Sequence, residues 1–149
     1  MTIPETGGTI EILLVEDNPG DVRLAEIALA ETALPGNHMS VARDGVEAMD
    51  FLHRIGCHRN APRPDLVLLD LNLPRKDGRQ VLREIKADKG LRSIPVVVLT
   101  TSKAREDIET VYDLKGNSYV NKPVDLEKFM TVMQAVYDFW LKTVELPRT

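Results

Sequence analysis

The sequence predicts an α/β fold in which a doubly wound, five-stranded parallel sheet is covered by five helices. The strongest sign is an unbroken apolar run, Leu66-Val67-Leu68-Leu69, between Pro64 and Pro74. A short run without a 3.6-residue period is typical of a strand buried on both faces, as in parallel sheets. Four other short strand-like runs alternate with segments whose apolar residues have helical spacing. This alternation implies βαβ units, right-handed crossovers and a three-layer sandwich.

Each expected strand is a short apolar segment that ends in polar residues. The strands span residues 10–15, 38–42, 66–69, 94–99 and 118–121. The segment 94–99 carries the strongest strand pattern, whereas 38–42 is weaker because its apolar residues alternate with polar ones. The strand at 66–69 is directly followed by Asp70, so this carboxylate is expected at the end of a buried strand.

The helices are indicated by capping residues at their starts and by apolar residues at helical spacing. Asn18 or Asp17 can cap the first helix, where Pro19 suits the first turn. Ser102 can cap the fourth helix, and Asp125 can cap the last. The apolar residues expected on the stripes of the second and fourth helices are Val46, Met49, Leu52, Ile55, Ala104, Ile108, Val111 and Tyr112.

The composition is that of one globular domain. The chain has 149 residues, enough to bury a core, and a formal charge of -4, which provides no basic face for nucleic acid. No apolar run approaches the roughly 20 residues of a transmembrane helix. No signal peptide is recognisable at the N-terminus, and Cys57 is the only cysteine. No internal disulfide can therefore form, and we expect a cytoplasmic location.

The chain divides into a short lead-in and a single domain. Residues 1–9 are polar, contain Pro4, Gly7 and Gly8, and are expected to form a flexible N-terminal segment. Residues 10–147 hold all the expected strands and helices, without a repeat or a low-complexity linker. Because no residues for a DNA-binding or catalytic output domain follow the last helix, we expect the output to be a partner protein.

Chemically reactive side chains stand at the ends of four expected strands. Glu16-Asp17 follow the first strand, Asp70 the third, Thr100 the fourth and Lys122 the fifth. In a parallel sheet these ends lie along one edge, which is where open α/β sheets bind ligands. Each residue alone would be an ordinary turn residue. As a set, they indicate a functional site.

Three carboxylates at this edge would repel one another unless a cation lies among them. Oxygen ligands without His or Cys suit Mg²⁺, which binds one or two protein carboxylates together with waters and a phosphate. The Lys122 ammonium and the Thr100 hydroxyl can each donate a hydrogen bond to a phosphoryl oxygen. With Asp70 as a carboxylate nucleophile, these groups supply what phosphoryl transfer onto an Asp requires.

Four segments resemble the motifs of the response-regulator receiver domain, the flavodoxin-like fold of chemotaxis-type regulators in two-component systems. They are residues 15–18 (VEDN), 68–74 (LLDLNLP) with Asp77-Gly78, 95–100 (PVVVLT) and 119–123 (YVNKP). The segments occur in order and span nearly the whole chain after residue 9. The resemblance implies a phosphoprotein of a phosphorelay that accepts a phosphoryl group on Asp70 from the phosphohistidine of a sensor histidine kinase.

The resemblance also implies a ligand set for Mg²⁺. Asp17 and Asp70 would bind the metal through their side chains, and Asn72 through its backbone carbonyl. Glu16 would act through the water shell of the metal. The protein would not be an enzyme in the usual sense, but a phosphoacceptor that catalyses its own phosphotransfer and slow dephosphorylation.

Further roles follow from the same resemblance for the last two strands. Lys122 and Thr100 would hold phosphoryl oxygens, and the Lys122-Pro123 bond would be cis, an isomer open mainly to X-Pro bonds. Tyr119 would be a rotamer switch that moves inward when Thr100 is drawn to the phosphate. A half-buried strand aromatic is the alternative interpretation of Tyr119, and the sequence leaves it open.

Additional features resemble the small stand-alone regulators that are paired with cyanobacterial phytochromes. They are residues 15–21 (VEDNPGD), the inserted loop 56–64, 99–102 (LTTS), 138–140 (DFW) and 143–147 (TVELP). This resemblance implies a phytochrome as the cognate kinase, while related regulators with the insertion pair with other kinases. Ser102 stands where the chemotaxis-type receiver has a Glu that shapes hydrolysis of the acyl phosphate, so the lifetime of the phosphorylated state is left open.

The last helix has a wider apolar surface than one packed side requires. Val132, Val136 and Phe139 lie on a face that adjoins its core-facing stripe. Packing against the fourth helix could cover part of this face, whereas an exposed patch would mark a partner surface. The resemblance implies a homodimer through the fourth helix, fifth strand and fifth helix.

Two other functions fit part of the pattern. A phosphatase with an Asp nucleophile needs a second carboxylate two residues later, where this chain has Asn72. Such enzymes also usually carry the nucleophile on the first strand. A binding module with a vestigial pocket is the other alternative, but it would have no reason to contain all five pocket residues. Reaction with a small phosphodonor and Mg²⁺ distinguishes the binding module from a phosphoacceptor, and turnover of a phosphomonoester would indicate the phosphatase.

Overall fold

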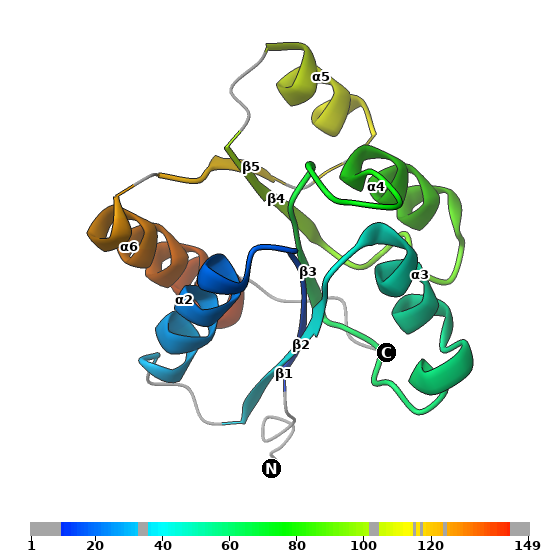
Figure 1. Cartoon of the computed structure of the whole chain (residues 1–149), viewed down its shortest axis with the longest axis horizontal. Coiled ribbons are helices and arrows are strands. Elements are labelled where there is room, and N and C mark those ends of the chain that lie inside the picture. The colour runs from blue at the N-terminus through cyan, green and yellow to red at the C-terminus, as the bar shows by residue number, and fades with distance from the viewer. Residues whose placement is uncertain are drawn as a thin grey trace.

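Five parallel strands form the central sheet in the part of the chain that the structure describes. The computed structural model describes residues 10–32, 36–101, 105–114, 116, 118–123 and 125–143. The strands are β1 (Ile10–Val15), β2 (Asn37–Ala42), β3 (Leu66–Leu69), β4 (Val96–Thr100) and β5 (Ser118–Asn121). Their order across the sheet is β2-β1-β3-β4-β5 (Figure 1). The predicted doubly wound parallel sheet is thereby confirmed.

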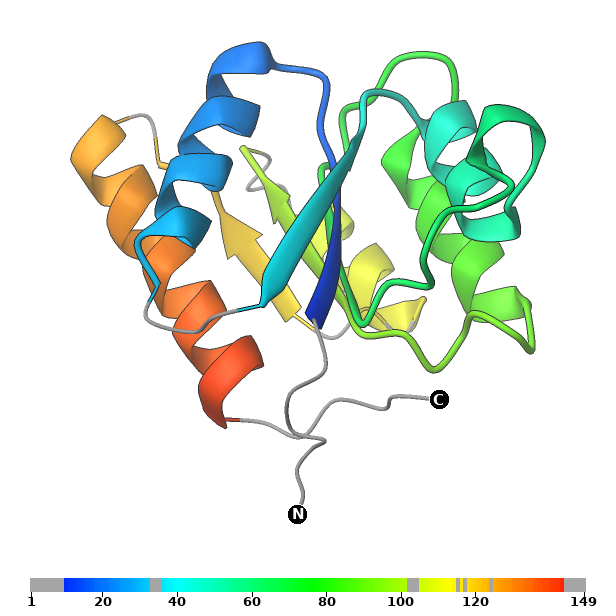
Figure 2. The same cartoon turned by 90° about the horizontal axis from the view of Figure 1, so that it is seen from below.

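The helices form two layers, one on each face of the sheet (Figure 1). α2 (Pro19–Ala30) and α6 (Leu126–Tyr137) lie side by side on one face. The other face is covered by α3 (Gly45–His53), α4 (Gly78–Ala87) and α5 (Arg105–Asp113). Figure 2 shows the sheet between these two layers, which is the arrangement of a three-layer sandwich.

The apolar run that predicted β3 is buried on both faces of the sheet. Val67 and Leu69 pack in the hydrophobic core beneath α3 and α4. Leu66 and Leu68 point the other way and pack in the core formed with α2 and α6. Because both faces are covered, the strand needs apolar residues at every position, and the alternation typical of a half-exposed strand is absent.

Side-chain caps fix the starts of the first and last helices. Asn18 Oδ1 accepts a 3.0 Å hydrogen bond from the backbone N–H of Asp21 at the start of α2. Asp125 Oδ1 accepts a 3.1 Å hydrogen bond from the backbone N–H of Lys128 at the start of α6. Asn18 is thus the cap among the two candidates, and Asp125 is confirmed. The predicted cap Ser102 lies outside the described residues.

Two apolar residues that were expected to face the core are exposed. Ile55 is 53% exposed because α3 ends at His53 and Arg54 adopts a left-handed φ of 57°, which turns the chain. Tyr112 is about half exposed on α5, next to the buried Val111. Met49, Leu52 and Val111 are buried as expected, and Ala104 lies outside the described residues. Apolar spacing did not show where α3 ends.

The peptide bond between Lys122 and Pro123 is trans, so the prediction of a cis bond was wrong. None of the described peptide bonds is cis. The trans form of an X-Pro bond is intrinsically favoured by about 0.5–1 kcal/mol. With this geometry the Lys122 backbone N–H donates a 2.8 Å hydrogen bond to the Thr100 carbonyl oxygen.

Two segments contain helical turns that are not α-helical. The loop at 56–64 begins with a short 3₁₀-helix, Gly56–His58. After α6 the chain continues through a π-helical segment, Asp138–Thr143, which holds Phe139 and Trp140. The predicted N-terminal segment 1–9 lies outside the described residues. No described helix combines the length and the hydropathy needed to cross a membrane.

Candidate functional site

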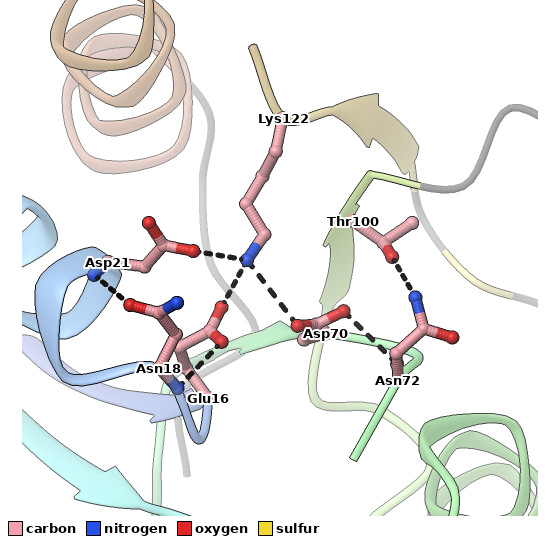
Figure 3. Close-up of polar contacts among 7 residues, drawn as sticks. All are labelled: Glu16, Asn18, Asp21, Asp70, Asn72, Thr100 and Lys122. Atoms are coloured by element: carbon pink, nitrogen blue, oxygen red, sulfur yellow. Dashed lines mark hydrogen bonds and ion pairs between the residues drawn. The ribbon is translucent and has the colours of Figure 1, made fainter. Parts of the chain in front are cut away.

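The site lies at the carboxyl-terminal edge of the sheet, where the apolar strands stop. Glu16 directly follows β1, Asp70 directly follows β3, and Thr100 is the last residue of β4. Lys122 directly follows β5 and reaches back toward Asp70 (Figure 3). Parallel pairing of β1, β3, β4 and β5 brings these four positions to one edge. The structure therefore brings together residues separated by up to 106 positions in the sequence.

Three carboxylates form the acidic part of the site. One oxygen from each of Glu16, Asp17 and Asp70 lies within 4.8 Å of the other two. Glu16 and Asp70 are buried, while Asp17 is exposed to solvent. In the described part of the chain this is the one group of three or more His, Cys, Asp or Glu side chains close enough to share an ion. A compact, oxygen-only donor set that is open to solvent on one side could bind a metal ion.

Lys122 is the buried cation of the site. Its Nζ lies 2.6 Å from Glu16 Oε1, 2.8 Å from Asp21 Oδ2 and 3.4 Å from Asp70 Oδ2. Burial lowers the pKa of the ammonium, but the hydrogen bonds to Asp21 and Glu16 outweigh this effect and hold the pKa above its usual range. Lys122 is therefore a fixed positive charge between carboxylates at any physiological pH.

Burial and hydrogen bonding shift the pKa of Glu16 in opposite directions. Burial is the main cause that raises the pKa of Glu16, to about 7, and the neighbouring Asp70 carboxylate adds to the rise. The hydrogen bond from Lys122 lowers the pKa but does not outweigh these two effects. Glu16 Oε2 also accepts a 3.2 Å hydrogen bond from the backbone N–H of Asn18. A second cation next to Glu16 would favour its ionised form, which makes this carboxylate responsive to metal binding.

Asp70 and Thr100 are connected through Asn72. The Asn72 backbone N–H donates a 3.1 Å hydrogen bond to Asp70 Oδ1. Its side-chain Nδ2 donates a 3.4 Å hydrogen bond to Thr100 Oγ1, which is fully buried. The loop after β3 thus holds one oxygen of Asp70 and places an amide against the hydroxyl of Thr100 (Figure 3).

Gly78 permits the close approach of α4 to the backbone of Asp70. Its N–H donates a 2.9 Å hydrogen bond to the Leu71 carbonyl oxygen. A Cβ at position 78 would overlap the carbonyl oxygen of Asp70 and the Cα of Leu71. Only glycine fits at this contact, so the packing next to the site explains why glycine follows Asp77 in the sequence.

Tyr119 lies on β5, where it pairs in register with Val98 of β4. Its side chain is partly buried and packs against the hydrophobic core on the side of α3, α4 and α5. This position agrees with the half-buried strand aromatic that the sequence left open. A switching role would require a second position of the ring.

Asp21 is a residue of the site that sequence reasoning missed. It stands in the first turn of α2, and its carboxylate forms a 2.8 Å ion pair with Lys122 Nζ. An acidic residue in the first turn of a helix usually serves only the helix dipole. The available signal was its place one turn after Glu16-Asp17, in a helix that starts at the same sheet edge.

Comparison with known proteins gives consistent matches over nearly the whole chain. The response regulator receiver domain matches residues 12–134. The chain is 48% identical to the response regulator Rcp1 of Synechocystis sp. over 136 residues, which are 91% of this chain and 92% of Rcp1. The Mn²⁺-bound crystal structure of Rcp1 superposes with a TM-score of 0.90 at 46% identity, covering 93% of this chain and 99% of that one. The crystal structure of the phosphorylated cyanobacterial phytochrome response regulator RcpA superposes with a TM-score of 0.91 at 48% identity, covering 94% and 99%.

Proposed function

The chain belongs to the response regulator receiver domain family, and on this premise we propose that it accepts a phosphoryl group on Asp70 from a sensor histidine kinase. The observation that supports this most directly is the position of Lys122 Nζ, 3.4 Å from Asp70 Oδ2 and among the carboxylates of Glu16 and Asp21. A cation next to a buried carboxylate nucleophile is what the transfer of a negatively charged group requires.

The proposed transfer uses the side chains in distinct roles. A carboxylate oxygen of Asp70 attacks the phosphorus of the kinase phosphohistidine, an O–P bond forms, and the N–P bond breaks with its electron pair going to the imidazole nitrogen. Lys122 then donates to a phosphoryl oxygen, and the hydroxyl of Thr100 donates to another. The protein is thus a phosphoacceptor that promotes its own phosphorylation and slow dephosphorylation, rather than an enzyme that turns over a separate substrate.

We propose Mg²⁺ as the metal of the acidic group. Asp17 and Asp70 would bind it through their side chains, Asn72 through its backbone carbonyl and Glu16 through bound water. The donor set fits, because it consists of hard oxygen ligands and includes an exposed carboxylate that leaves room for water. When bound, the ion supplies positive charge that offsets the charge of the phosphoryl oxygens.

Thr100 and Tyr119 form the proposed switch. In the unphosphorylated protein the hydroxyl of Thr100 accepts a hydrogen bond from Asn72 Nδ2. This hydroxyl can still donate its own proton to a phosphoryl oxygen, and a movement of the Thr100 side chain toward that oxygen would change the space next to β5. Tyr119 would then move inward and alter the surface of α5 and β5, a two-state response of the kind that switches partner binding.

A phytochrome is the kinase that we propose, and the cytoplasm is the proposed location. The support is the similarity to a regulator whose crystal structure is described as that of a cyanobacterial phytochrome response regulator. A histidine kinase with another sensor is the alternative. Phosphotransfer from purified, autophosphorylated kinases distinguishes the two: we expect transfer within seconds to minutes from a phytochrome kinase and slower transfer from an unrelated one.

A homodimer through α5, β5 and α6 is also part of the proposal. An apolar pocket of about 760 Å³ lies at the open edge of β5 beside α6. Its lining residues are Ser118, Val120, Val132, Ala135, Val136, Phe139 and Trp140. Phe139 is also half exposed, so a second copy could cover both the pocket and this ring. Sedimentation analysis should detect a dimer of the wild type and a weaker one of Phe139→Glu.

The proposed function is tested with phosphoramidate and Mg²⁺. We expect the wild type to gain the mass of one phosphoryl group and Asp70→Asn to gain none. Asp113→Asn, an exposed acidic residue on α5, is the matched control and should behave like the wild type. An unchanged mass of the wild type, or an increment on Asp70→Asn, would contradict the assignment. Hydrolysis of p-nitrophenyl phosphate would point instead to a phosphatase, and we expect none.

A further inference from the structure

Asp21 is held at the rim of the site by the start of α2. Its backbone N–H donates to Asn18 Oδ1, which fixes the first turn of the helix. α2 is held against α6 by a 2.9 Å hydrogen bond that Tyr137 Oη donates to the carbonyl oxygen of Ala25. The carboxylate of Asp21 therefore approaches Lys122 from a rigid element and not from a loop (Figure 3).

Lys122 depends on neighbours for its position. A lysine side chain has four rotatable bonds and must lose their freedom to hold Nζ in one place. The side chain of Lys122 is 5% exposed and crosses from β5 toward the ends of β1 and β3. The contact with Asp70, at 3.4 Å, is the longest of its three ion pairs and is too weak to fix the ammonium by itself.

Three protons of the ammonium face three carboxylates. Glu16 at 2.6 Å and Asp21 at 2.8 Å take two of them in short, charge-assisted hydrogen bonds. The third proton is thereby directed to Asp70, which is the group that would carry the phosphoryl oxygens. Glu16 adjoins the proposed metal position, whereas Asp21 is outside the group of carboxylates whose oxygens converge. Asp21 can therefore position the Lys122 ammonium without binding the metal.

We propose that Asp21 is a positioning residue for the reaction: together with Glu16 it holds the Lys122 ammonium so that the third donor points at Asp70. This inference rests on the proposed phosphorylation of Asp70. Through Asp21, the first turn of α2 would then help to orient Lys122, in addition to the residues at the strand ends. Asp21 does not contact Asp70 and acts through Lys122 only.

The inference is tested by phosphorylation of Asp21→Ala and Asp21→Asn with phosphoramidate at saturating Mg²⁺. We expect the rate to fall about tenfold in Asp21→Ala, since misplacement of a charged group by a fraction of an ångström has effects of this size. Asp21→Asn retains an oxygen acceptor without the charge and should fall less. Asp21→Glu should recover part of the rate. The Mg²⁺ affinity, measured by calorimetry, should change less than about twofold, because Asp21 is not among the converging carboxylates.

A second readout reports on the lysine itself without metal or phosphodonor. In protein with ¹⁵N-labelled lysine, the Lys122 ammonium should give a slowly exchanging NMR signal in the wild type and lose it in Asp21→Ala. Glu127→Ala is the matched control, because Glu127 is the acidic residue in the first turn of α6 and is exposed. It should change neither the rate nor the signal.

The outcomes separate the two proposals. If the wild type is not phosphorylated, the proposed function fails. If the wild type is phosphorylated and Asp21→Ala reacts equally fast or faster with an unchanged lysine signal, the positioning role is overturned. Circular dichroism verifies the fold of each variant, and Asp21→Asn, which preserves the shape of the side chain, decides the question should Asp21→Ala be unfolded.

Discussion

Lys122 Nζ lies 3.4 Å from Asp70 Oδ2, although the two residues are 52 positions apart in the sequence. They follow β5 and β3, two strands separated in the sheet by β4, so the lysine side chain has to cross the end of β4. Both residues are buried. Charges in such an environment depend on each other, because water can solvate neither of them fully.

The first prediction concerns the removal of this buried cation. Lys122→Met keeps a long apolar side chain but leaves Glu16 and Asp70 without their cationic neighbour. We expect the free energy of unfolding in metal-free buffer to fall by about 3–5 kcal/mol, as is usual when one partner of a buried ion pair is removed. Urea denaturation followed by circular dichroism measures the change.

An exposed lysine provides the matched control for that variant. Lys128 lies in the first turn of α6, and Lys128→Met should change the free energy of unfolding by less than about 0.5 kcal/mol. Mg²⁺ should restore part of the stability of Lys122→Met, because it supplies positive charge to the same carboxylates. Equal losses in the two variants would show that the buried cluster is not what Lys122 stabilises.

The second prediction concerns Asp17, the exposed member of the acidic group. Mg²⁺ at a hundredfold excess over its dissociation constant should stabilise the wild type by about 2.7 kcal/mol. Asp17→Asn should lose most of this gain, and its metal-free form should be at least as stable as the wild type, because one of three repelling carboxylates is gone. Thermal denaturation with and without Mg²⁺ measures both effects. Asp113→Asn is the control, and Mg²⁺ binding by Asp17→Asn as tight as that of the wild type would rule out this metal site.

The positions of Glu16, Asp70 and Thr100 could be predicted because each depends on one local fact. An apolar run ends there, and parallel strands place such ends on one edge. The alternation of strands and helices predicted a parallel sheet with right-handed crossovers, whereas the flavodoxin-like fold was implied by the resemblance to receiver domains. For this reason the architecture and the identity of the strand-end residues were accessible from the sequence.

Asp21 and Ile55 could not be placed in the same way, because they depend on how a helix is rotated and where it ends. Which first-turn residue of α2 faces the sheet edge is decided by the Asn18 cap and by packing on α6. Ile55 fits the apolar spacing of α3, but the left-handed Arg54 ends the helix before it. The trans bond at Pro123 is likewise set by small energy differences that a motif does not reveal.

The third prediction tests the contact between α4 and the backbone of Asp70. In Gly78→Ala the new methyl group would meet the Asp70 carbonyl oxygen and Leu71, so the loop after β3 has to shift. We expect a loss of about 1–3 kcal/mol in the free energy of unfolding, the usual cost of overpacking. The rate of phosphorylation by phosphoramidate should fall as well, because Asp70 moves with the loop.

Gly90→Ala is the control for this contact. The nearest atom to a Cβ at position 90 is the carboxylate oxygen Oδ1 of Asp88, at 3.3 Å, and this flexible side chain can move aside. The variant should keep the wild-type rate of phosphorylation and lose little stability. A normal phosphorylation rate in Gly78→Ala would show that the tight packing of α4 serves the fold and not the site.

The fourth prediction concerns Tyr137, which joins α6 to α2 through its 2.9 Å hydrogen bond to the Ala25 carbonyl oxygen. Tyr137→Phe should lower the free energy of unfolding at pH 7 by about 1–2 kcal/mol, because the hydrogen bond is buried. Burial, with a smaller contribution from Glu26, holds the pKa of Tyr137 well above its usual range. The exposed Tyr112 provides the control, and Tyr112→Phe should leave the free energy of unfolding at pH 7 unchanged.

The sign of the pH dependence follows from the raised pKa of Tyr137. The unfolded chain releases the phenolic proton near pH 10, whereas the folded chain retains it, so the folded state binds more protons above pH 10. The contribution of the Tyr137 hydroxyl to the free energy of unfolding is therefore fully present below pH 10 and is lost as the pH rises from there through the folded-state pKa. Between pH 9 and pH 11 the advantage of the wild type over Tyr137→Phe should shrink by about 1.4 kcal/mol. Urea denaturation at both pH values measures this change. If the difference in the free energy of unfolding between the two proteins is the same at both pH values, the hydroxyl is not protected by the packing of α2 on α6.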